Sequence, residues 1–483
     1  MATRWDPGRG GRARTARRAA RACGTTALAC GATALALALQ GCDSYARKDV
    51  DLAAHRSEFL ARTPQTPELQ GFAEALAPRS AGTLATFDPT DGLTEPEAEV
   101  VAIVFNADLR LARLKAGIAL ASAENAGLWD DPVVGVDLQR VMGNAPTLEV
   151  LSMIEFTIPI SGRLELEKQH MGAEHAAELA RVAQEEWRVR IALRRAWTEW
   201  SARELELRTT QEFVERIDAL LTIVQALEKA GELRRIDARL FHIEQETRRA
   251  EVTMLRARVR EAALELRHLM GLAPRASVEL AHDGLGSPAY EGAAPAAPDG
   301  SDLGARSPLM LVAQAEYEAT ERALELEIRK QIPDLKLGPG YGQLDGADEF
   351  MLGIGLPIPI LNANRLAIAQ AKAKRELARA GAEIALERLM ASAQMAAVKL
   401  EAATAVREQY ERTVVPMVDA QYGDARRVAE LGEVDTYVLL ESLTRQQRAK
   451  IELIEARRQE TLARIDIEEV IGPAPVAAKE TTP

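Results

Sequence analysis

The stretch Pro132–Ile160, PVVGVDLQRVMGNAPTLEVLSMIEFTIPI, contains two short segments in which apolar residues recur at every second position. Such alternation is typical of β-strands that have one apolar face. Between the two segments, Gly143-Asn144-Ala145-Pro146 is made of residues that favour turns. The stretch therefore predicts a pair of strands joined by a turn and ending near Ile158.

The same pattern returns about 200 residues later, in Pro333–Ile360, PDLKLGPGYGQLDGADEFMLGIGLPIPI. Here the alternation covers Leu335 to Tyr341 and Phe350 to Ile358, and Asp345–Asp348 supplies the predicted turn. Five pairs of landmarks share a spacing of 201 or 200 residues: Asn106 and Ser307, Pro132 and Pro333, Pro159 and Pro359, Gly231 and Gly432, Gly271 and Gly472. A spacing kept over five landmarks predicts two internal repeats, 93–277 and 307–472.

Each repeat is predicted to run helix, strand, strand, long helix, helix. The long helical stretches, Leu164–Lys229 and Leu366–Ala429, have about 65 residues each, which gives rods of roughly 100 Å. Gly231 and Gly432 end them, and shorter return helices follow. We expect each return helix to lie end to end with the opening helix of its repeat, beside one long helix.

The first opening helix has a clear start signal. Thr94-Glu95-Pro96-Glu97 has the spacing of a capping box, with proline in the first turn. We expect this helix to continue to about Leu128.

The N-terminus of the chain has the pattern of a secretory signal. Basic residues between Arg12 and Arg21 precede an apolar run, Thr26 to Leu39, which is too short to span a bilayer. Leu39-Gln40-Gly41-Cys42 follows, so residues 1–41 are predicted to be removed. This segment resembles a bacterial lipoprotein signal, which implies that Cys42 is acylated. An ordinary signal with an incidental cysteine is the alternative.

The remaining segments are predicted to be connections. Residues 42–92 are rich in Pro, Thr and Ala and are expected to form an extended arm. Residues 278–306 are a predicted linker rich in Gly, Ala and Pro, and 473–483 form a C-terminal tail. The 483-residue chain has a formal charge of −12, which argues against a nucleic-acid partner.

The four strands have the length of tilted membrane-spanning strands. Four strands cannot close a barrel, and an open edge cannot lie in lipid because its backbone groups would lack hydrogen-bond partners. Three copies would supply twelve strands, enough for a pore, with the helices forming a tunnel below it. The fold class expected is therefore mostly α with a small β part, assembled as a trimeric twelve-stranded β-barrel that continues into an α-helical barrel. The alternative is a structural periplasmic coiled-coil lipoprotein without a pore, which the low aromatic content of 4% favours.

The chain resembles the TolC-type outer-membrane efflux protein family over residues 91–472. The resemblance rests on Leu93–Ala98, on Leu356-Pro357-Ile358-Pro359-Ile360 and on Asn362–Ala373, whose Pro-x-Pro form looks most like Czc-type heavy-metal efflux members. It implies a passive exit duct, lipid-anchored in the cell outer membrane, with a periplasmic helical tunnel. It also implies a homotrimer that works with a periplasmic membrane-fusion adaptor and an inner-membrane pump of the resistance-nodulation-division type. Asp43 resembles an inner-membrane retention signal of enteric bacteria, so membrane sorting stays open.

The resemblance also implies functional positions. The glycine-containing turns at Gly231 and Gly432 are expected to form the tips that dock on the adaptor. In the family a ring of carboxylates narrows the tunnel beyond the second tip, where Asp435 and Glu441 are the acidic residues here. Those two are candidate gate residues, and a solvated helix face is the alternative explanation.

Catalytic or cofactor chemistry is not expected. Glu167–His170 and Glu265–His268 have the Glu-x-x-His spacing of di-iron bundles. They lie at opposite ends of a predicted helix pair, however, and such a spacing between an acidic residue and a histidine is expected by chance in a chain with many acidic residues. No zinc-protease motif, phosphate loop, Cys-x-x-Cys or nucleophile elbow is present. Charged residues between Glu185 and Glu199 are expected to form a solvated face. No enzyme activity, cofactor or metal site is predicted.

Overall fold

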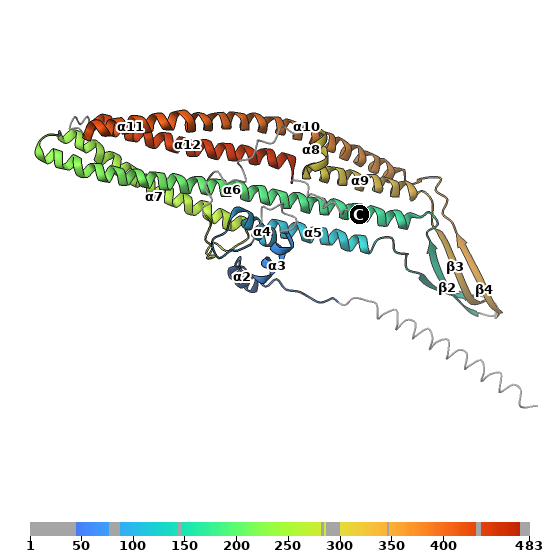
Figure 1. The fold of residues 1–483 in the computed structure, drawn as a ribbon. Helices are drawn as coiled ribbons and strands as arrows, with labels where there is room; N and C mark the ends of the chain where they lie inside the picture. The colour runs from blue at the N-terminus through green and yellow to red at the C-terminus, as the bar shows by residue number, and fades with distance from the viewer. Residues whose placement is uncertain are drawn as a thin grey trace, which may run out of the picture. The chain divides into compact units, whose positions relative to one another are not determined.

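The computed structural model describes residues 45–76, 87–142, 147–281, 285, 300–344, 347–430 and 436–473. By internal contacts the chain divides into two units, 1–58 and 59–483. In the second unit most residues are helical, and four strands form one antiparallel sheet. Figure 1 shows the sheet at one end of these helices and the turn between α6 and α7 at the opposite end.

The element order helix, strand, strand, long helix, helix occurs twice along the chain. The first set is α5 (Ala107–Glu124), β1 (Val133–Val141), β2 (Thr147–Ile158), α6 (Arg163–Ala230) and α7 (Arg235–Leu269). The second set is α9 (Pro308–Arg329), β3 (Leu335–Leu344), β4 (Ala347–Gly355), α10 (Arg365–Gln409) with η3 (Tyr410–Val414) and α11 (Val415–Glu430), then α12 (Thr436–Ile471). The bounds of both long helical stretches differ from the predicted ones by a single residue at each end.

Two details of the predicted strands differ from the structure. Ala347 and Asp348, expected in a turn, belong to β4, which pairs Ala347 with Leu344. That strand ends at Gly355 and does not reach Ile358. The reason is the run Leu356–Ile360, whose two prolines lack the N–H that a continuing ladder needs. The turn predicted at residues 143–146 lies outside the described residues.

The opening helix is divided in two, and the expectation of one helix to Leu128 was wrong. α4 (Glu95–Phe105) begins as predicted, because the Glu97 carboxylate accepts hydrogen bonds from the Thr94 backbone N–H at 2.9 Å and the Thr94 hydroxyl at 2.7 Å. Asn106 then leaves the helical conformation, at ψ 133°, and its side chain accepts from the N–H groups of Asp108 and Leu109. Asparagine is a favoured N-cap, so it ends α4 and starts α5.

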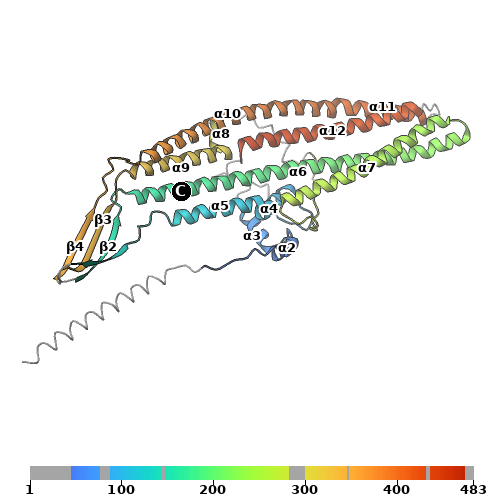
Figure 2. The same ribbon diagram turned by 180° about the vertical axis from the view of Figure 1, so that it is seen from behind.

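The end of α7 meets the start of α5, which confirms the predicted end-to-end arrangement. The Asn106 side-chain amide donates to the Leu269 carbonyl at 2.8 Å. Gly271 has a φ of +68°, and a Cβ added to it would lie 2.1 Å from the Phe105 carbonyl oxygen. Only glycine fits such a close approach with a left-handed backbone. Both α5 and α7 pack along α6 in the two views (Figure 1 and Figure 2).

The second half has the same kind of junction. Gly472 has a φ of +86°, and a Cβ there would lie 2.5 Å from the Arg306 carbonyl oxygen, next to the first residue of α9, Pro308. Both α9 and α12 pack along α10. The return helices α7 and α12 therefore each end at the opening helix of their own half.

The predicted extended arm contains two helices, so that expectation was wrong over these residues. They are α2 (Leu52–Ala61), which has no buried residue, and α3 (Pro67–Leu76), which buries Leu69 and Ala73. Arg62 lies between them and donates to the Gly271 carbonyl at 3.1 Å. Its guanidinium also lies 5.5 Å from the centre of the Phe105 ring, so Arg62 packs on the junction of α7 and α5.

Parts of the predicted linker are structured as well. Leu93 pairs with Leu280 in a parallel bridge, since the Leu93 N–H donates to the Glu279 carbonyl at 2.9 Å. Further along, α8 (Gly300–Arg306) buries Leu303 against α9 and α10. One end of the segment is therefore attached beside the start of α4, and the other end to α9 and α10.

The second long rod is interrupted, whereas a continuous α-helix was expected. The chain makes a π-helical turn over Tyr410–Val414, two residues before Pro416. A proline inside an α-helix lacks the N–H for the hydrogen bond to residue i−4, and its ring collides with that carbonyl. A π-turn widens the helix locally, and this accommodates Pro416 without ending the rod.

The helical core has its largest side chains on α6. Val189, Leu193, Trp197 and Trp200 pack with α4 and with the end of α7, and the two indole rings meet edge to face at 5.4 Å. These four residues are spaced by three or four positions, so they lie on one face of α6. The junction of α4, α5 and α7 is therefore built on one face of α6.

Ion pairs connect helices where a solvated face was expected. Arg190 and Arg194 of α6 donate to Glu99 of α4, which is 7% exposed, at 2.8 and 2.5 Å. Arg194 also donates to Glu468 and Arg195 to Asp466, both on α12. Arg188 lies on the surface as predicted and pairs with Glu185 of its own helix, but it also donates to Asp108 of α5 at 3.3 Å. All four arginines therefore join α6 to its neighbours.

Candidate functional site: the two-faced sheet and the helical tip

The four strands form one antiparallel sheet in the order β1, β2, β3, β4. β2 pairs with β3, and so joins the two halves of the chain. The register runs straight across the sheet, and one row is Asp137, Leu151, Gly342 and Glu349. Because side chains alternate along a strand, residues in one such row share one face.

One face of the sheet is almost entirely apolar. Its described residues away from the turn ends are Val134, Val136, Leu138, Val150, Ser152, Ile154, Phe156, Ile158, Leu335, Leu337, Pro339, Tyr341, Phe350, Leu352 and Ile354. Polar residues on this face, such as Arg140, Gln343 and Asp348, lie towards the turns between the strands of each hairpin. Val134 is 70% exposed, Phe350 74% and Ile354 68%, so within the chain this apolar surface is uncovered.

The opposite face is polar and rich in glycine. Its described members are Val133, Gly135, Asp137, Gln139, Glu149, Leu151, Met153, Glu155, Thr157, Lys336, Gly338, Gly340, Gly342, Ala347, Glu349, Met351, Gly353 and Gly355. Glu155 and Lys336 form an ion pair at 2.7 Å. The other acidic residues of this face are Asp137, Glu149 and Glu349.

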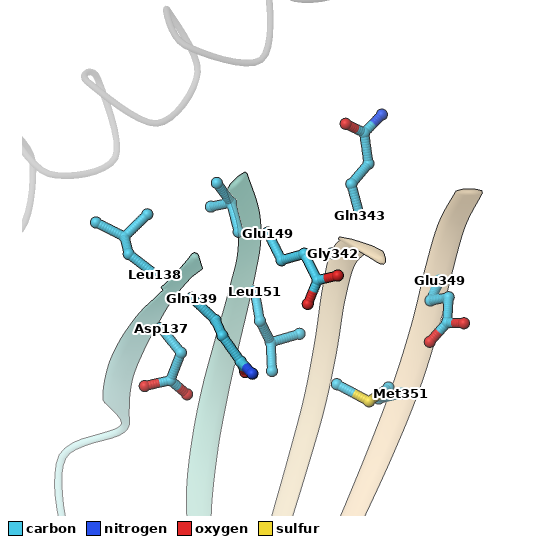
Figure 3. Close-up of a pocket in the computed structure, with 10 residues that line it drawn as sticks. Asp137, Leu138, Gln139, Glu149, Leu151, Gly342, Gln343, Glu349 and Met351 are labelled. Atoms are coloured by element: carbon cyan, nitrogen blue, oxygen red, sulfur yellow. The ribbon is translucent and has the colours of Figure 1, made fainter. Parts of the chain in front are cut away.

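A shallow hollow of ≈ 410 Å³ lies among the acidic residues near the turn end of the sheet. Asp137 and Gln139 of β1, Glu149 of β2 and Glu349 of β4 contribute to its lining. Figure 3 shows Gln343, which belongs to the apolar face, pointing to the opposite side from Glu149 and Glu349. The hollow therefore has carboxylates from three of the four strands.

Gly342 keeps the middle of this hollow free of a side chain. A Cβ at this position would lie 2.8 Å from the Val150 carbonyl oxygen and 3.1 Å from a methyl group of Leu151. A glycine in a strand often marks such close packing of neighbours. No side chain of β3 therefore stands between Leu151 and Glu349 in this row.

These carboxylates were not predicted from the sequence as site residues. The signal was present, since Asp137, Gln139, Glu149 and Glu155 occupy the odd positions between the apolar residues of the first strand pair. What the alternation alone cannot provide is the register between strands that are far apart in sequence. The register places Asp137 and Glu349, 212 positions apart in number, in one row.

The first predicted tip lies at Gly231, between α6 and α7. Gly231 has a φ of +78°, and the N–H of Glu232 donates to the Leu227 carbonyl at 3.0 Å. A Cβ at Gly231 would meet no atom within 4 Å, so the turn is open to solvent. Arg234 and Arg235 follow and are more than 80% exposed, and they pair with Asp237 and Glu228, so the tip presents charges of both signs.

Behind the tip, the hairpin packs on the second half of the chain. Phe213, Ile217 and Leu221 of α6 and Phe241 of α7 form a buried cluster with Leu443 of α12. Arg216 of α6 donates to the Gln446 side chain at 3.0 Å, and Gln446 donates to Asp419 of α11 at 2.7 Å. The α6–α7 hairpin is therefore held to α11 and α12 near its end.

Of the second predicted tip and the two predicted gate residues, the structure describes only Glu441. Gly432 and Asp435 lie outside the described residues. Glu441, on α12, is exposed and pairs with Arg445 one helical turn away at 2.7 Å. This is the geometry of a surface pair within one helix, and it leaves the gate role of Glu441 a prediction.

The lipidation position and signal segment, Cys42 and residues 1–41, also lie outside the described residues. Among the helices that the structure does describe, none is both long and apolar enough to cross a membrane.

The two Glu-x-x-His pairs lie far from each other. His170 of α6 lies 3.4 Å from Glu174, and Glu167 faces Arg163. His268 lies at the end of α7. Across the described ranges, no group of three or more His, Cys, Asp or Glu side chains is placed to hold a metal ion.

Several solved structures share the arrangement of this chain. The outer-membrane channel OprN is 18% identical, with a TM-score of 0.65 over 89% of this chain and 98% of its own. The outer membrane protein VceC from Vibrio cholerae is 14% identical, with a TM-score of 0.65 over 78% and 96% of the two chains. The outer membrane channel CmeC from Campylobacter jejuni is 13% identical, with a TM-score of 0.60 over 89% and 93%.

By sequence alone, no protein-family model and no curated protein matches the chain. The structural likeness covers nearly the whole length of those channels and includes both the sheet and the helices. The chain therefore has the fold of the TolC-type outer-membrane efflux channels, as the sequence resemblance predicted.

Proposed function

We propose that this chain is the outer-membrane channel-tunnel of a tripartite efflux system, a passive exit duct for substrates driven by an inner-membrane pump. The observation that carries the proposal is the two-faced sheet. Its exposed apolar face is suited to lipid, and its polar face to water, which is the pattern of membrane-spanning strands. A soluble sheet with this much uncovered apolar surface would be a site of aggregation.

Three copies would complete the barrel. β1 and β4 are the two edges of the described sheet, and an edge left open in lipid has unsatisfied backbone groups. Pairing of β4 with β1 of the next copy closes a twelve-stranded barrel whose apolar face is outside. Exposed apolar residues on α5, such as Leu111, Leu114 and Ile118, support contact between the helices of neighbouring copies.

The helices would form the periplasmic tunnel. Residues 93–277 and 307–472 act in this proposal as two repeats, each contributing one long rod and one end-to-end pair of shorter helices. A trimer then has twelve columns of helix around its axis. The segment 278–306 connects the repeats, and 473–483 is a tail.

The tips would dock on a periplasmic membrane-fusion adaptor that links the channel to the pump. The open turn at Gly231 and the exposed Arg234 and Arg235 support this role at the first tip. Gly432 is the proposed equivalent, and Asp435 and Glu441 are the proposed gate. A resistance-nodulation-division pump for heavy metals is the partner that the Pro-x-Pro segment favours.

The lipid anchor would position the protein at the outer membrane. In this proposal, residues 1–41 are a lipoprotein signal peptide and the acylated Cys42 holds the segment 42–92 at the inner leaflet. The alternative function is a structural periplasmic lipoprotein with no pore. The low aromatic content is the observation that favours it, because few residues are available for interfacial girdles.

Conductance in planar lipid bilayers separates the two functions. Purified trimer is expected to form channels, and a charge on the lipid face should prevent their insertion. Val136→Lys places that charge on the apolar face, at a cost of about 2–4 kcal/mol near the bilayer midplane. The matched control, Gln139→Lys, changes the polar face of the same strand and should still conduct.

Absence of channels from the wild-type trimer in repeated trials would leave the structural lipoprotein as the function. Equal insertion of both variants would contradict the assignment of the faces.

A further inference from the structure

We propose that two methionines on the polar face of the sheet, Met153 and Met351, form a thioether site for soft monovalent cations such as Ag⁺ and Cu⁺. This inference rests on the proposed function, since the site would lie on the wall of a water-filled pore and its ligand would be a transported ion. Thioether sulfur is a soft ligand that suits Cu⁺, whereas Mg²⁺ and Ca²⁺ are bound by oxygen. The two residues therefore indicate a chemical class of substrate.

The register of the sheet places both methionines in one row with two glycines. Met153 of β2 faces Gly135 of β1 and Gly340 of β3, and Gly340 in turn faces Met351 of β4. The two methionines are separated by β3, so their Cα atoms are roughly 10 Å apart, since neighbouring strands lie about 4.8 Å apart. In this row, which lies wholly within the described residues, glycine leaves the space between the two thioethers free of other side chains.

The side chain of Met153 lies over β3. A Cβ added to Gly338 would be 3.1 Å from the Met153 sulfur and 3.5 Å from its Cγ. A Cβ added to Gly340 would be 3.6 Å from the Met153 Cβ. A larger residue at Gly338 would therefore displace the thioether, and the glycines of β3 make room for it.

The side chain of Met351 approaches the same strand from the other side. Figure 3 shows it extending from β4 towards β3. Met351 is 42% exposed and contributes to the lining of the hollow of ≈ 410 Å³. Both thioethers are therefore directed over β3, and the site is reached from the open side of the sheet.

The surroundings favour a cation that binds and leaves again. Asp137 and Glu349 are exposed on the same face, in the next row towards the turns, and negative charge raises the local concentration of cations of every kind. The thioethers are neutral, so they add a preference for soft cations to this attraction. Conduction requires binding that is favourable enough for entry and weak enough for exit, and two neutral ligands per copy fit that requirement.

The first test is calorimetric titration of the detergent-solubilised trimer with Ag⁺, in nitrate salts because chloride precipitates silver. We expect Met153→Leu/Met351→Leu to weaken the binding by more than about 100-fold, because the loss of even an indirect partner of a metal ligand costs about 10–100-fold. Leucine has nearly the volume of methionine, which preserves the packing. Met351→Leu alone changes an exposed residue and should also weaken the binding, so a folding defect of the double variant would not hide the result.

The matched control is Met254→Leu/Met395→Leu, which removes two thioethers from exposed positions on α7 and α10. It should bind Ag⁺ as the wild type does, and every variant keeps Cys42, so any binding there is common to all of them. Titration with Mg²⁺ should not distinguish the wild type from either double variant.

The second test is single-channel conductance in planar bilayers, again in nitrate salts. Micromolar Ag⁺ should lower the conductance of wild-type and control channels but not that of Met153→Leu/Met351→Leu. Equal Ag⁺ binding by the wild type, the double variant and Met351→Leu would overturn the inference and leave the proposed function standing. Wild-type trimer that never conducts would overturn the proposed function, and with it the role of this site in transport.

Discussion

The helices and the sheet of this chain place their apolar residues in opposite ways. In the helical body the large side chains are buried, and Leu193, Trp197 and Phe241 are each 3% exposed or less. In the sheet, Phe350 and Ile354 of β4 are 74% and 68% exposed. The helices are therefore stabilised by burial within one chain, whereas the apolar face of the sheet is uncovered within the chain. Under the proposed function, lipid and further copies would cover that face.

Truncation of one aromatic residue in each region should give the largest contrast. Trp197→Ala removes a buried side chain that touches Trp200, and should lower the free energy of unfolding by about 3–5 kcal/mol. Phe350→Ala removes an exposed ring and should change it by less than about 0.5 kcal/mol.

The measurement is thermal unfolding of the helices, followed by circular dichroism in detergent. Equal losses in the two variants would mean that Phe350 packs on something within the folded chain. That result would contradict the difference in burial between the helices and the sheet.

A smaller loss of stability is expected when the ion pairs between helices near the π-turn are removed. Arg457 of α12 and Arg407 of α10 both donate to Glu411, at 2.6 and 2.7 Å, and these hydrogen bonds lower the pKa of Glu411 below its ordinary value. Since Glu411 is 38% exposed, solvent screens the pairs, and Glu411→Gln should cost less than about 1 kcal/mol at neutral pH.

The pH dependence of that variant provides the check. A carboxylate with a depressed pKa stabilises the fold above its unfolded-state pKa of about 4.3, and this contribution is lost as the pH falls through the lower folded-state pKa. The difference in melting temperature between wild type and Glu411→Gln should therefore be constant from pH 7 to 5 and shrink below about pH 4. A difference that grows on acidification would contradict the assignment.

In both regions the sequence predicted the features that depend on neighbouring residues. The end of α6 was predicted to within one residue, because Gly231 changes the backbone locally. The apolar face of the sheet was equally visible in the period of two. The helix end and the apolar face both depend on residues that lie close together in the sequence.

Features that depend on distant residues were missed. Asn106 ends a helix whose neighbour is the α7 terminus, 163 positions away at Leu269. α3 forms where Leu69 and Ala73 pack against the core. The ion-pair partners of Glu99 are arginines on α6, about 90 positions away in the sequence. In the candidate site, Gly231 was predicted from local backbone chemistry. The carboxylate row required a register that links strands from both halves.

Labelling of single cysteines distinguishes the face of the sheet that is proposed to meet lipid from the face that is proposed to meet water. The sequence has no cysteine after Cys42, so new ones report with little background. Cysteines at Val136, Leu138 and Phe350 lie on the apolar face, and those at Asp137, Gln139 and Glu349 on the polar face.

The measurement is the extent to which a water-soluble thiol reagent modifies each variant in outer-membrane preparations. We expect modification at the three polar-face positions and protection at the three apolar-face positions. Equal modification at all six, or protection on the polar face with modification on the apolar face, would contradict it.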